Sequence, residues 1–561
     1  MTRYARTPLR LLVAFVFLFT SAACTAARPG KTAIASADPL ATAAGYEVLE
    51  EGGNAFDAAV AVAAALGVVE PAASGFGGGG FFLLYRADEE EYRFVDAREV
   101  APAAAGRNMY IDGNGQPLPG GSVDGPLAAG IPGEPAGMVY LAENYGTLPL
   151  SRLLQPAIEL AENGYRIEAR SLMGLRFRKQ TLEKSAAFAE VFYPDGQVPE
   201  NGALIAQPDL AATLKRFAAG GFDGFYKGET ARLLVDGVRA AGGIWSMEDL
   251  ANYRVVEREP SVTNFSGMRV ITAPPPSSGG VALTQMFNLL SGYPFAELEG
   301  AQRKHYMVEA MRRAYRDRAI YLGDPDFVAI PLSMLLSRDY MAGQRVSVRG
   351  DRATPSSVLD GIDTDGSEGT QTTHFSVMDA DGNRVAATLT INTWYGAGFM
   401  PPGTGVVLNN EMDDFSIKRG LPNEYELIGD EANSIAPGKR PLSSMSPTFL
   451  ESDRGIAIVG TPGGSRIITM VLQAAIEWLE GGTGEDMVSM KRFHHQYLPD
   501  EIRYEPGAIS DTEIAELEAM GHTLKPSRRP FGNMNVVTWD FASGKVEAAT
   551  DPRGRAEGRV Y

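Results

Sequence analysis

Thr372 stands where a chain that cuts itself would expose a threonine nucleophile. The sequence Thr-Gln-Thr-Thr at 370–373 joins a polar stretch rich in Gly, Ser and Asp (349–371) to a strongly alternating segment (373–391). Cleavage of the Gln371–Thr372 bond would give Thr372 both a hydroxyl and a free α-amine, so the nucleophile would carry its own base. An α-amine has a pKa near about 7.7–8.0, which suits general-base catalysis at neutral pH. The alternative is that the two threonines only begin a β-strand, where threonine is common.

The segment after Thr372 predicts a β-hairpin that brings a second hydroxyl to the nucleophile. Residues 374–378 and 384–390 alternate with a period of two and flank Asp-Ala-Asp-Gly-Asn, a strong turn signal. A turn centred near Asp381 and Gly382 would place Thr372 opposite Thr390 or Ile391. We therefore expect Thr390 to reach Thr372 from the neighbouring strand.

Other patterns predict the elements that must position such a site. Asn54 is placed to cap a helix over 55–69 that ends before Pro71, and 81–85 reads as a buried strand. A strand over 92–96 would carry Arg98 at its end. Residues 274–280 predict a loop that leads into a helix over 281–290, and 302–321 have the spacing of an amphipathic helix.

Two motifs that resemble cofactor or metal sites are interpreted as structural. The glycines of 75–80 formally satisfy GxGxxG, but they precede a strand instead of opening a helix, which excludes a dinucleotide or P-loop site. We expect close backbone packing or an active-site wall there. His494 and His495 are adjacent and would point apart on a strand, so we assign no metal and no cofactor.

Composition and the N-terminus bear on partners and location. The 561 residues carry a formal net charge of −18, which disfavours nucleic acid as a partner, and no linker divides the chain into independent cores. Arginines precede an apolar run at 11–19 that is too short to span a membrane, and small residues follow it, as in a secretory signal over 1–27. Cys24 is the only cysteine and stands where a lipoprotein signal, cut at 23/24, is lipidated. We expect an exported, periplasmic protein whose only membrane contact is such a lipid anchor; the alternative is an ordinary signal cleaved near Ala27.

The chain resembles the γ-glutamyltranspeptidase family of N-terminal nucleophile hydrolases over nearly everything after about residue 30. The resemblance is carried by the segments GGNAFDAAVAVAAALGVVEP, FVDAREVAP, AYRDRAIYLGDPDF, TTHFSVMDADGN, NNEMDDFS, KRPLSSMSPT, GTPGGSRIIT and RFHHQYLPDE, in that order. It implies an α+β fold, a four-layer αββα sandwich built jointly by two chains made from one precursor. The two chains would be a large subunit of 28–371 and a small catalytic subunit of 372–561, paired as a heterodimer.

The same resemblance implies roles for single residues. Gly463 and Gly464 match the oxyanion hole, and glycines suit that role because backbone N–H groups can then approach the oxyanion closely. Arg98 matches the arginine that binds the α-carboxylate of the substrate, with Ser443 and Ser444 adding hydroxyl donors. The positions that hold the α-ammonium are matched by Asn392, Glu411 and Asp414. Tyr425 stands in the segment 419–431, which resembles a lid. Many bacterial relatives carry glutamine at the position of Glu411, so a more acidic pocket is implied here.

The resemblance implies a γ-glutamyltransferase and glutathione hydrolase. It would move γ-glutamyl groups from glutathione and other γ-glutamyl donors to water or to amino-acid or peptide acceptors, through an ester on Thr372. One alternative is an acylase that cleaves glutaryl or cephalosporin-type amides on the same scaffold; Glu411, Asp414 and the lid segment favour the γ-glutamyl reading. A non-enzymatic alternative is an uncut precursor that serves as a lipid-tethered binding protein.

Overall fold

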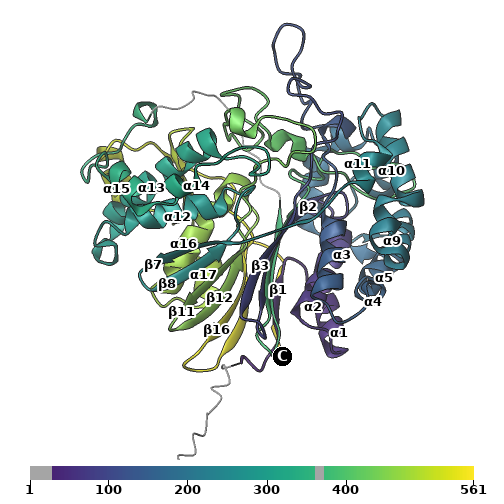
Figure 1. Cartoon of the computed structure of the whole chain (residues 1–561), viewed down its shortest axis with the longest axis horizontal. Helices are drawn as coiled ribbons and strands as arrows, with labels where there is room; N and C mark the ends of the chain where they lie inside the picture. The colour runs from purple at the N-terminus through teal and green to yellow at the C-terminus, as the bar shows by residue number, and fades with distance from the viewer. Residues whose placement is uncertain (1–27, 360–371) are drawn as a thin grey trace, which may run out of the picture.

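The computed structural model of the protein describes residues 28–359 and 372–561. Within them, two large antiparallel sheets pack face to face and helices cover both outer faces (Figure 1). The expected four-layer αββα sandwich is therefore confirmed. The expected signal over 1–27, with Cys24, and Gln371 of the expected cleavage site lie outside the described residues.

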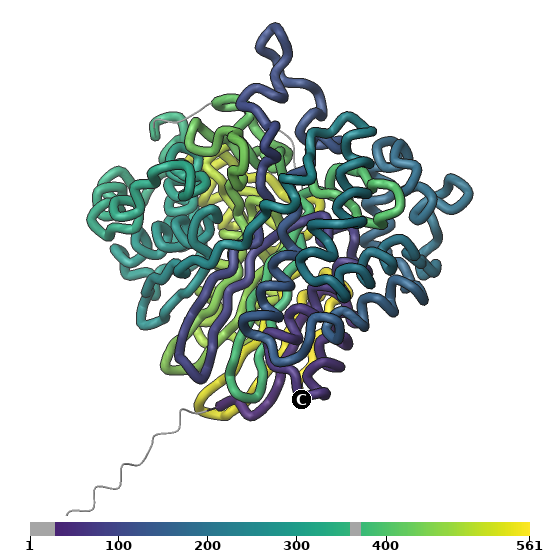
Figure 2. Tube along the Cα trace, turned by 45° about the vertical axis from the view of Figure 1, so that its right-hand side comes forward, coloured from purple at the N-terminus to yellow at the C-terminus, as the bar shows by residue number. Residues whose placement is uncertain are grey.

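The first sheet combines strands from both sides of Thr372. Its order is β18-β1-β9-β10-β2-β3-β6, so that strands from the two ends of the chain are neighbours. Figure 2 shows this as the purple N-terminal trace running beside the yellow C-terminal one. The strands are β1 (Ala33–Ser36), β2 (Gly79–Arg86), β3 (Glu91–Ala97), β6 (Val256–Arg258), β9 (Thr373–Met378), β10 (Arg384–Thr390) and β18 (Glu557–Val560).

The second sheet also combines strands from both sides of Thr372. Its order is β17-β16-β12-β11-β8-β7, with two strands that precede Thr372 and four that follow it. A cut before Thr372 would thus leave two chains that share both sheets. The strands are β7 (Ser261–Phe265), β8 (Met268–Thr272), β11 (Thr448–Ser452), β12 (Gly455–Gly460), β16 (Asn535–Asp540) and β17 (Val546–Thr550).

Two groups of helices form the outer layers (Figure 1). The first sheet is covered by α1 (Pro39–Glu50), α2 (Ala55–Val69), α3 (Glu134–Asn144), α5 (Gln155–Asn163), α9 (Pro208–Tyr226) and α10 (Gly228–Ala240). The second sheet is covered by α12 (Gly279–Leu290), α13 (Gly300–Tyr321), α15 (Arg338–Arg345), α16 (Ile467–Leu479) and α17 (Gly484–Ser489).

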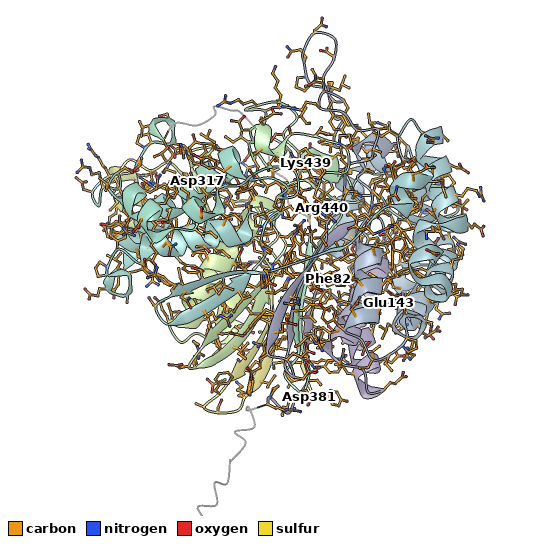
Figure 3. The ribbon with its side chains drawn as sticks, viewed as in Figure 1. Phe82, Glu143, Asp317, Asp381, Lys439 and Arg440 are labelled. Atoms are coloured by element: carbon orange, nitrogen blue, oxygen red, sulfur yellow. The ribbon has the colours of Figure 1, made fainter. Side chains whose placement is uncertain are left out.

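Strand β2 has an apolar sequence because both of its faces are buried. Side chains alternate across a strand, and both faces of this sheet are covered. Phe82 and Leu84 join the core under the helices, while Phe81 and Leu83 join the core between the sheets. Phe82, labelled in Figure 3, points toward the helix α3, where a Cβ on Gly137 would lie 3.0 Å from its ring. The expected buried strand over 81–85 is confirmed, extended by a few residues.

The expected helices are also present, with one correction. Asn54 caps α2 by accepting hydrogen bonds from the amides of Phe56 and Asp57 at 2.9 and 3.0 Å. Helix α12 begins at Gly279, two residues before the expected start. Helix α13 (Gly300–Tyr321) includes the expected 302–321. An amphipathic helix would expose its polar side to solvent, and that expectation was wrong. Its buried residues include Glu309, Arg312 and Arg318, because α13 is packed among other segments that provide polar partners.

The hairpin of β9 and β10 has the register that the sequence predicts. Arg384 pairs with Met378 and Leu389 pairs with Thr373, so the next position sets Thr372 opposite Thr390. At the turn, Asp379 Oδ1 accepts hydrogen bonds from three successive amides. Figure 3 shows Asp381 of this turn at the bottom of the molecule, with Arg440 well above it in the upper half. The hairpin therefore delivers Thr372 to the upper edge of the sandwich.

Candidate active site

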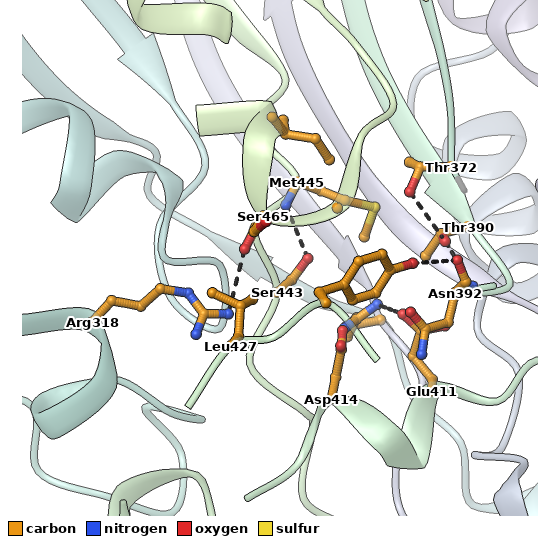
Figure 4. A pocket seen from close by; sticks show the side chains of 15 residues that line it. Arg318, Thr372, Thr390, Asn392, Glu411, Asp414, Leu427, Ser443, Met445 and Ser465 are labelled. Carbon is orange, nitrogen blue, oxygen red and sulfur yellow. Dashed lines mark hydrogen bonds and ion pairs between the residues drawn. The ribbon is translucent and has the colours of Figure 1, made fainter. Parts of the chain in front are cut away.

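A pocket at this edge collects most of the residues that the sequence singles out. It lies where β9 begins, where β10 ends, and where loops follow β3 and β12 (Figure 4). The free space inside is about 20 Å³, enough for roughly one water-sized sphere, so neighbouring side chains must move to admit an amino acid. The expected residues that line it are Arg98, Thr372, Thr390, Asn392, Glu411, Asp414, Tyr425, Ser443, Ser444 and Gly464.

Thr372 and Thr390 form the expected pair of hydroxyls. Thr372 Oγ1 donates to Thr390 Oγ1 over 3.4 Å, and Thr390 Oγ1 also accepts from the amide of Asn392 at 2.8 Å. Thr372 is buried, with 3 % of its surface exposed. Its neighbour Thr373 donates to Glu70 on the other face of the strand, at 2.7 Å. The start of β9 is thus fixed on both faces, with the hydroxyl of Thr372 toward the pocket.

Gly463 and Gly464 occupy positions that require glycine. They follow β12 and lead through a short 3-10 helix, η7 (Gly464–Arg466), into α16. Their φ angles are +147° and +58°, where side chains are disfavoured, and a Cβ on Gly464 would lie 2.3 Å from the ring of Tyr425. Gly464 lines the pocket itself, whereas Gly463 lines a larger cavity next to it. The expected oxyanion-hole backbone therefore stands between two cavities.

Arg98 is paired with the two acids that were expected to bind a substrate ammonium. Its Nη1 donates to Glu411 Oε1, and its Nη2 donates to Asp414 Oδ2 at 2.6 Å. Both acids come from the 3-10 helix η5 (Glu411–Asp414). Glu411 Oε2 is buried and has no hydrogen-bond partner among the described residues. One carboxylate oxygen beside the pocket thus remains able to accept a hydrogen bond from a ligand.

The charges around Arg98 are unbalanced. Glu99 also lies near it, 3.5 Å from its Nη1, so three carboxyl groups surround one guanidinium. Burial raises the pKa of Glu99 to about 8 and raises those of Glu411 and Asp414, although Arg98 opposes each shift. Burial disfavours the charged form of Arg98, but these carboxylates more than offset it and raise its pKa. A cationic group that enters the pocket would favour the ionised forms of these carboxyl groups and would be bound by them.

The serines have hydroxyl protons to offer. Ser443 Oγ accepts a hydrogen bond from the amide of Met445 at 3.1 Å, and Ser444 Oγ accepts one from Arg318 Nη2 at 3.3 Å. A hydroxyl that accepts still has its own proton to donate. Both serines line the pocket.

The segment 419–431 closes over the pocket. The hydroxyl of Tyr425 donates to the backbone oxygen of Asn392, and its own backbone oxygen accepts from Gln496 at 3.1 Å. Asn423 contributes at both ends, since its amide donates to Asp414 and its oxygen accepts from the amides of Tyr425 and Leu427. Asn392 has a φ of +75°, and its side-chain amide donates to the oxygen of Asn410. The segment therefore has the position that a lid requires.

One charged lining residue was not predicted from the sequence. Arg318, near the end of α13, reaches the pocket from the side opposite the Glu411 and Asp414 acids in Figure 4. It belongs to the AYRDRAIYLGDPDF segment that supports the family resemblance, but its spacing indicated only a helix face. Its burial depends on the packing of α13 and has no local signal.

The histidines lie outside the pocket. His494 bonds Thr469 and Gln496, and His495 bonds Asp500, which fits the structural role expected for this pair. His305, Glu309 and His522 come together elsewhere. Because Arg312 and Arg313 both pair with Glu309 there, we do not assign a metal to that cluster.

Comparisons with known proteins identify the family to which the chain is similar. Residues 41–561 match the Gamma-glutamyltranspeptidase family. The chain is 46 % identical over 494 residues to a glutathione hydrolase proenzyme of Pseudomonas sp. (strain A14), covering 87 % of this chain and 85 % of that protein. It is 40 % identical over 525 residues to the glutathione hydrolase proenzyme of Escherichia coli (strain K12), covering 93 % and 90 %.

Solved structures share the fold. The cephalosporin acylase of Bacillus halodurans is similar with a TM-score of 0.83 at 25 % identity, covering 100 % of this chain and 98 % of that one. The gamma-glutamyltranspeptidase of Helicobacter pylori is similar with a TM-score of 0.57 at 42 % identity, covering 58 % of this chain and 94 % of that one. The overall fold is therefore common to two kinds of amide-cleaving enzyme, and the pocket must decide between them.

Proposed function

The chain belongs to the gamma-glutamyltranspeptidase family, and from that premise we propose that Thr372 takes up a γ-glutamyl group as an ester and passes it to water or to an amine. The chain is accordingly an enzyme of the glutathione hydrolase type. The observation that carries the proposal is the joint placement of a strand-initial threonine and groups of both charges in one pocket.

The pocket matches the two charges of a γ-glutamyl donor. The α-ammonium would bind Glu411 and Asp414, and the unpartnered Glu411 Oε2 supports this assignment. The α-carboxylate would bind Arg98, Ser443 and Ser444. Because a zwitterion brings one charge of each sign, it can replace the internal Arg98–Asp414 pairing without leaving a buried charge unpaired.

The reaction would follow the order of an N-terminal nucleophile amidase. The α-amine of Thr372 takes the proton of the hydroxyl, whose oxygen attacks the γ-carbonyl carbon. The amides of the 463–464 backbone stabilise the tetrahedral oxyanion, and the proton passes to the leaving amine as the C–N bond breaks. Water or an acceptor amine then attacks the ester and restores the hydroxyl.

We propose cleavage of the Gln371–Thr372 bond as the step that creates this nucleophile. The Thr372 hydroxyl would attack the preceding carbonyl, and water would hydrolyse the resulting ester. The products would be the large subunit 28–371 and the small subunit 372–561. Their shared sheets support a stable heterodimer after the cut.

The larger cavity beside Gly463 fits the leaving group and the acceptor. It measures about 460 Å³ and is lined by residues that include Trp394, Arg170 and Arg529. Gly463 lines this cavity and Gly464 lines the donor pocket, so the cavity would lie on the leaving-group side of the reacting carbonyl. Its arginines would favour amino-acid or peptide acceptors with a free carboxylate. Comparison of glycylglycine with glycylglycine amide as acceptors tests this assignment.

The acylase alternative has one specific observation in its favour, the similarity to a cephalosporin acylase. A glutaryl substrate lacks the α-ammonium, so it has no cation to pair with the buried carboxyl groups of Glu411 and Asp414. The decisive test is kcat/KM for a γ-glutamyl anilide against a glutaryl anilide. Strong preference for the γ-glutamyl compound supports the proposal, and equal values would promote the acylase reading.

We also propose that the protein is exported to the periplasm, with lipidation of Cys24 after cleavage at 23/24. The charge and apolar pattern of 1–27 supports this. No helix among the described residues is long and apolar enough to cross a membrane. Labelled fatty acid in the wild-type protein, and none in Cys24→Ala, would support the lipid anchor.

A further inference from the structure

Arg318 is a buried cation that no carboxylate neutralises directly. Only 5 % of its surface is exposed, and it forms no ion pair with any described residue within 4.0 Å. Its Nε donates to Ser278 Oγ at 3.1 Å, and its Nη2 donates to Ser444 Oγ at 3.3 Å. Both partners are neutral hydroxyls. Burying a charge in this way is unfavourable unless a partner arrives, which makes the placement of Arg318 informative.

Arg98 differs from Arg318 in this respect. Its guanidinium already contacts Glu411 and Asp414. Burial lowers the pKa of Arg318 to about 10, with Asp414 opposing that shift, so the side chain stays positively charged at neutral pH. Of the two arginines that line the pocket, Arg318 is therefore the one that has no carboxylate partner among the described residues.

The hydrogen bond from Arg318 also sets the direction of the Ser444 hydroxyl. Because one lone pair of Ser444 Oγ faces the guanidinium, the hydroxyl proton of Ser444 must point elsewhere. Arg318 and Ser444 line the same pocket. Ser278, the other partner, donates its proton to the backbone oxygen of Ser443 at 2.8 Å. Arg318 thus connects the loop before α12 to the loop that carries both pocket serines.

We propose that Arg318 is a positioning residue for the α-carboxylate of the γ-glutamyl donor: it fixes Ser444 as a hydrogen-bond donor and adds a second positive charge beside that of Arg98. The inference rests on the proposed function. It assigns to α13 a part in substrate recognition that is separate from the Arg98–Glu411–Asp414 cluster.

The test is a comparison of ligands with and without the α-carboxylate in Arg318→Gln. The substrates are a γ-glutamyl anilide and a 4-aminobutyryl anilide, which has the same amide and ammonium but no carboxylate. We expect kcat/KM for the γ-glutamyl anilide to fall about ten- to a hundredfold, mainly through KM, as for loss of a charge-assisted hydrogen bond. The value for the 4-aminobutyryl anilide should stay within about twofold. Arg318→Lys, which keeps the charge, should recover part of the loss.

A second readout does not require turnover of the poorer substrate. Inhibition of γ-glutamyl anilide hydrolysis by free glutamate should weaken in Arg318→Gln, while inhibition by 4-aminobutyrate should not change. Arg303→Gln is the matched control, because Arg303 lies on the same helix and pairs with Glu480 at the surface. Production of two chains reports that each variant folds.

The outcomes separate this inference from the proposed function. Equal losses for both ligand types in Arg318→Gln, with no gain from the lysine variant, would show that Arg318 only supports the fold. Wild-type kinetics in Arg318→Gln would overturn the inference as well. If the wild-type protein did not cleave the γ-glutamyl anilide at all, the proposed function itself would fail.

Discussion

Arg98 Nη2 lies 2.6 Å from Asp414 Oδ2, so the residue assigned to the substrate carboxylate contacts a residue assigned to the substrate ammonium. The free space of about 20 Å³ beside them is too small for a γ-glutamyl group. In the proposed function, substrate binding exchanges this internal pair for two pairs with the zwitterion. The ion pair holds Arg98 and Asp414 in place when no substrate is bound, and it must break when the zwitterion binds.

Arg98→Lys tests the geometry of this exchange. Lysine keeps the charge but loses the planar fork that reaches two oxygens at once. We expect KM for a γ-glutamyl anilide to rise and kcat/KM to fall about ten- to a hundredfold, the effect of about 1.5–3 kcal/mol. Self-cleavage should continue, since Arg98 does not contact Thr372 in any described interaction. Unchanged kinetics in the lysine variant would remove Arg98 from the donor site.

Asp414→Asn tests the selectivity for donors that carry an α-ammonium. The substitution keeps the shape of the side chain and removes one negative charge. We expect it to narrow the preference for γ-glutamyl over glutaryl anilide, mainly by harming the γ-glutamyl substrate, because polar sites discriminate through groups left unpaired. The matched control is Asp236→Asn, which removes an exposed carboxylate far from the pocket in α10. A preference that stays at its wild-type value would argue against the ammonium role.

Tyr425→Phe tests how much the hydroxyl of Tyr425 contributes to holding the 419–431 segment over the pocket. The phenylalanine loses the bond to the backbone oxygen of Asn392, which is worth about 0.5–1.5 kcal/mol. Hydrogen exchange at the amides of Tyr425 and Leu427 should accelerate by roughly two- to tenfold. Exchange in β16, which the segment does not cover, serves as the internal control. Identical exchange in both proteins would show that the segment is held by other contacts.

Glu134→Gln gives a prediction for pH. Glu134 is fully buried at the start of α3, and burial raises its pKa to about 8. A carboxyl group whose pKa is higher in the folded state stabilises the fold at low pH, and this contribution is lost as pH rises from about 4.5 through 8. Glutamine is neutral throughout, and it can still accept the hydrogen bond from the amide of Gly75.

The measurement is the thermal midpoint of both proteins as a function of pH. At pH values above about 8 we expect Glu134→Gln to be the more stable protein, whereas the two should converge near pH 5, where the wild-type carboxyl group is protonated. Glu159→Gln, on the exposed surface of α5, is the matched control. A variant less stable than wild type above pH 8 would contradict the raised pKa of Glu134.

The sequence allowed prediction of those parts of the site that depend on local patterns. Thr390 could be placed opposite Thr372 because a short turn fixes the register of a hairpin. The resemblance supplied residues such as Ser443, which single-sequence reasoning about the chain does not link to Thr372. The glycines of 75–80 were correctly expected to pack closely: a Cβ on Gly78 would lie 2.1 Å from the oxygen of Thr390.

Features that depend on tertiary packing could not be predicted. The pairing of Arg98 with Glu411 joins residues that are 313 positions apart, and no pattern near either one indicates it. The spacing of 302–321 predicted an amphipathic helix and did not single out Arg318, which is buried in α13. Charged residues at helical spacing therefore did not distinguish a surface from a polar interior.

The proposed threonine mechanism depends most directly on the cut that makes Thr372 an N-terminus. Purified protein should therefore be separated on a denaturing gel, and the smaller chain should be sequenced from its N-terminus. We predict two chains in the wild-type protein, with the smaller one beginning at Thr372, and one uncut chain in Thr372→Ala. A single uncut wild-type chain, or a small chain that begins at any other residue, would contradict the threonine mechanism.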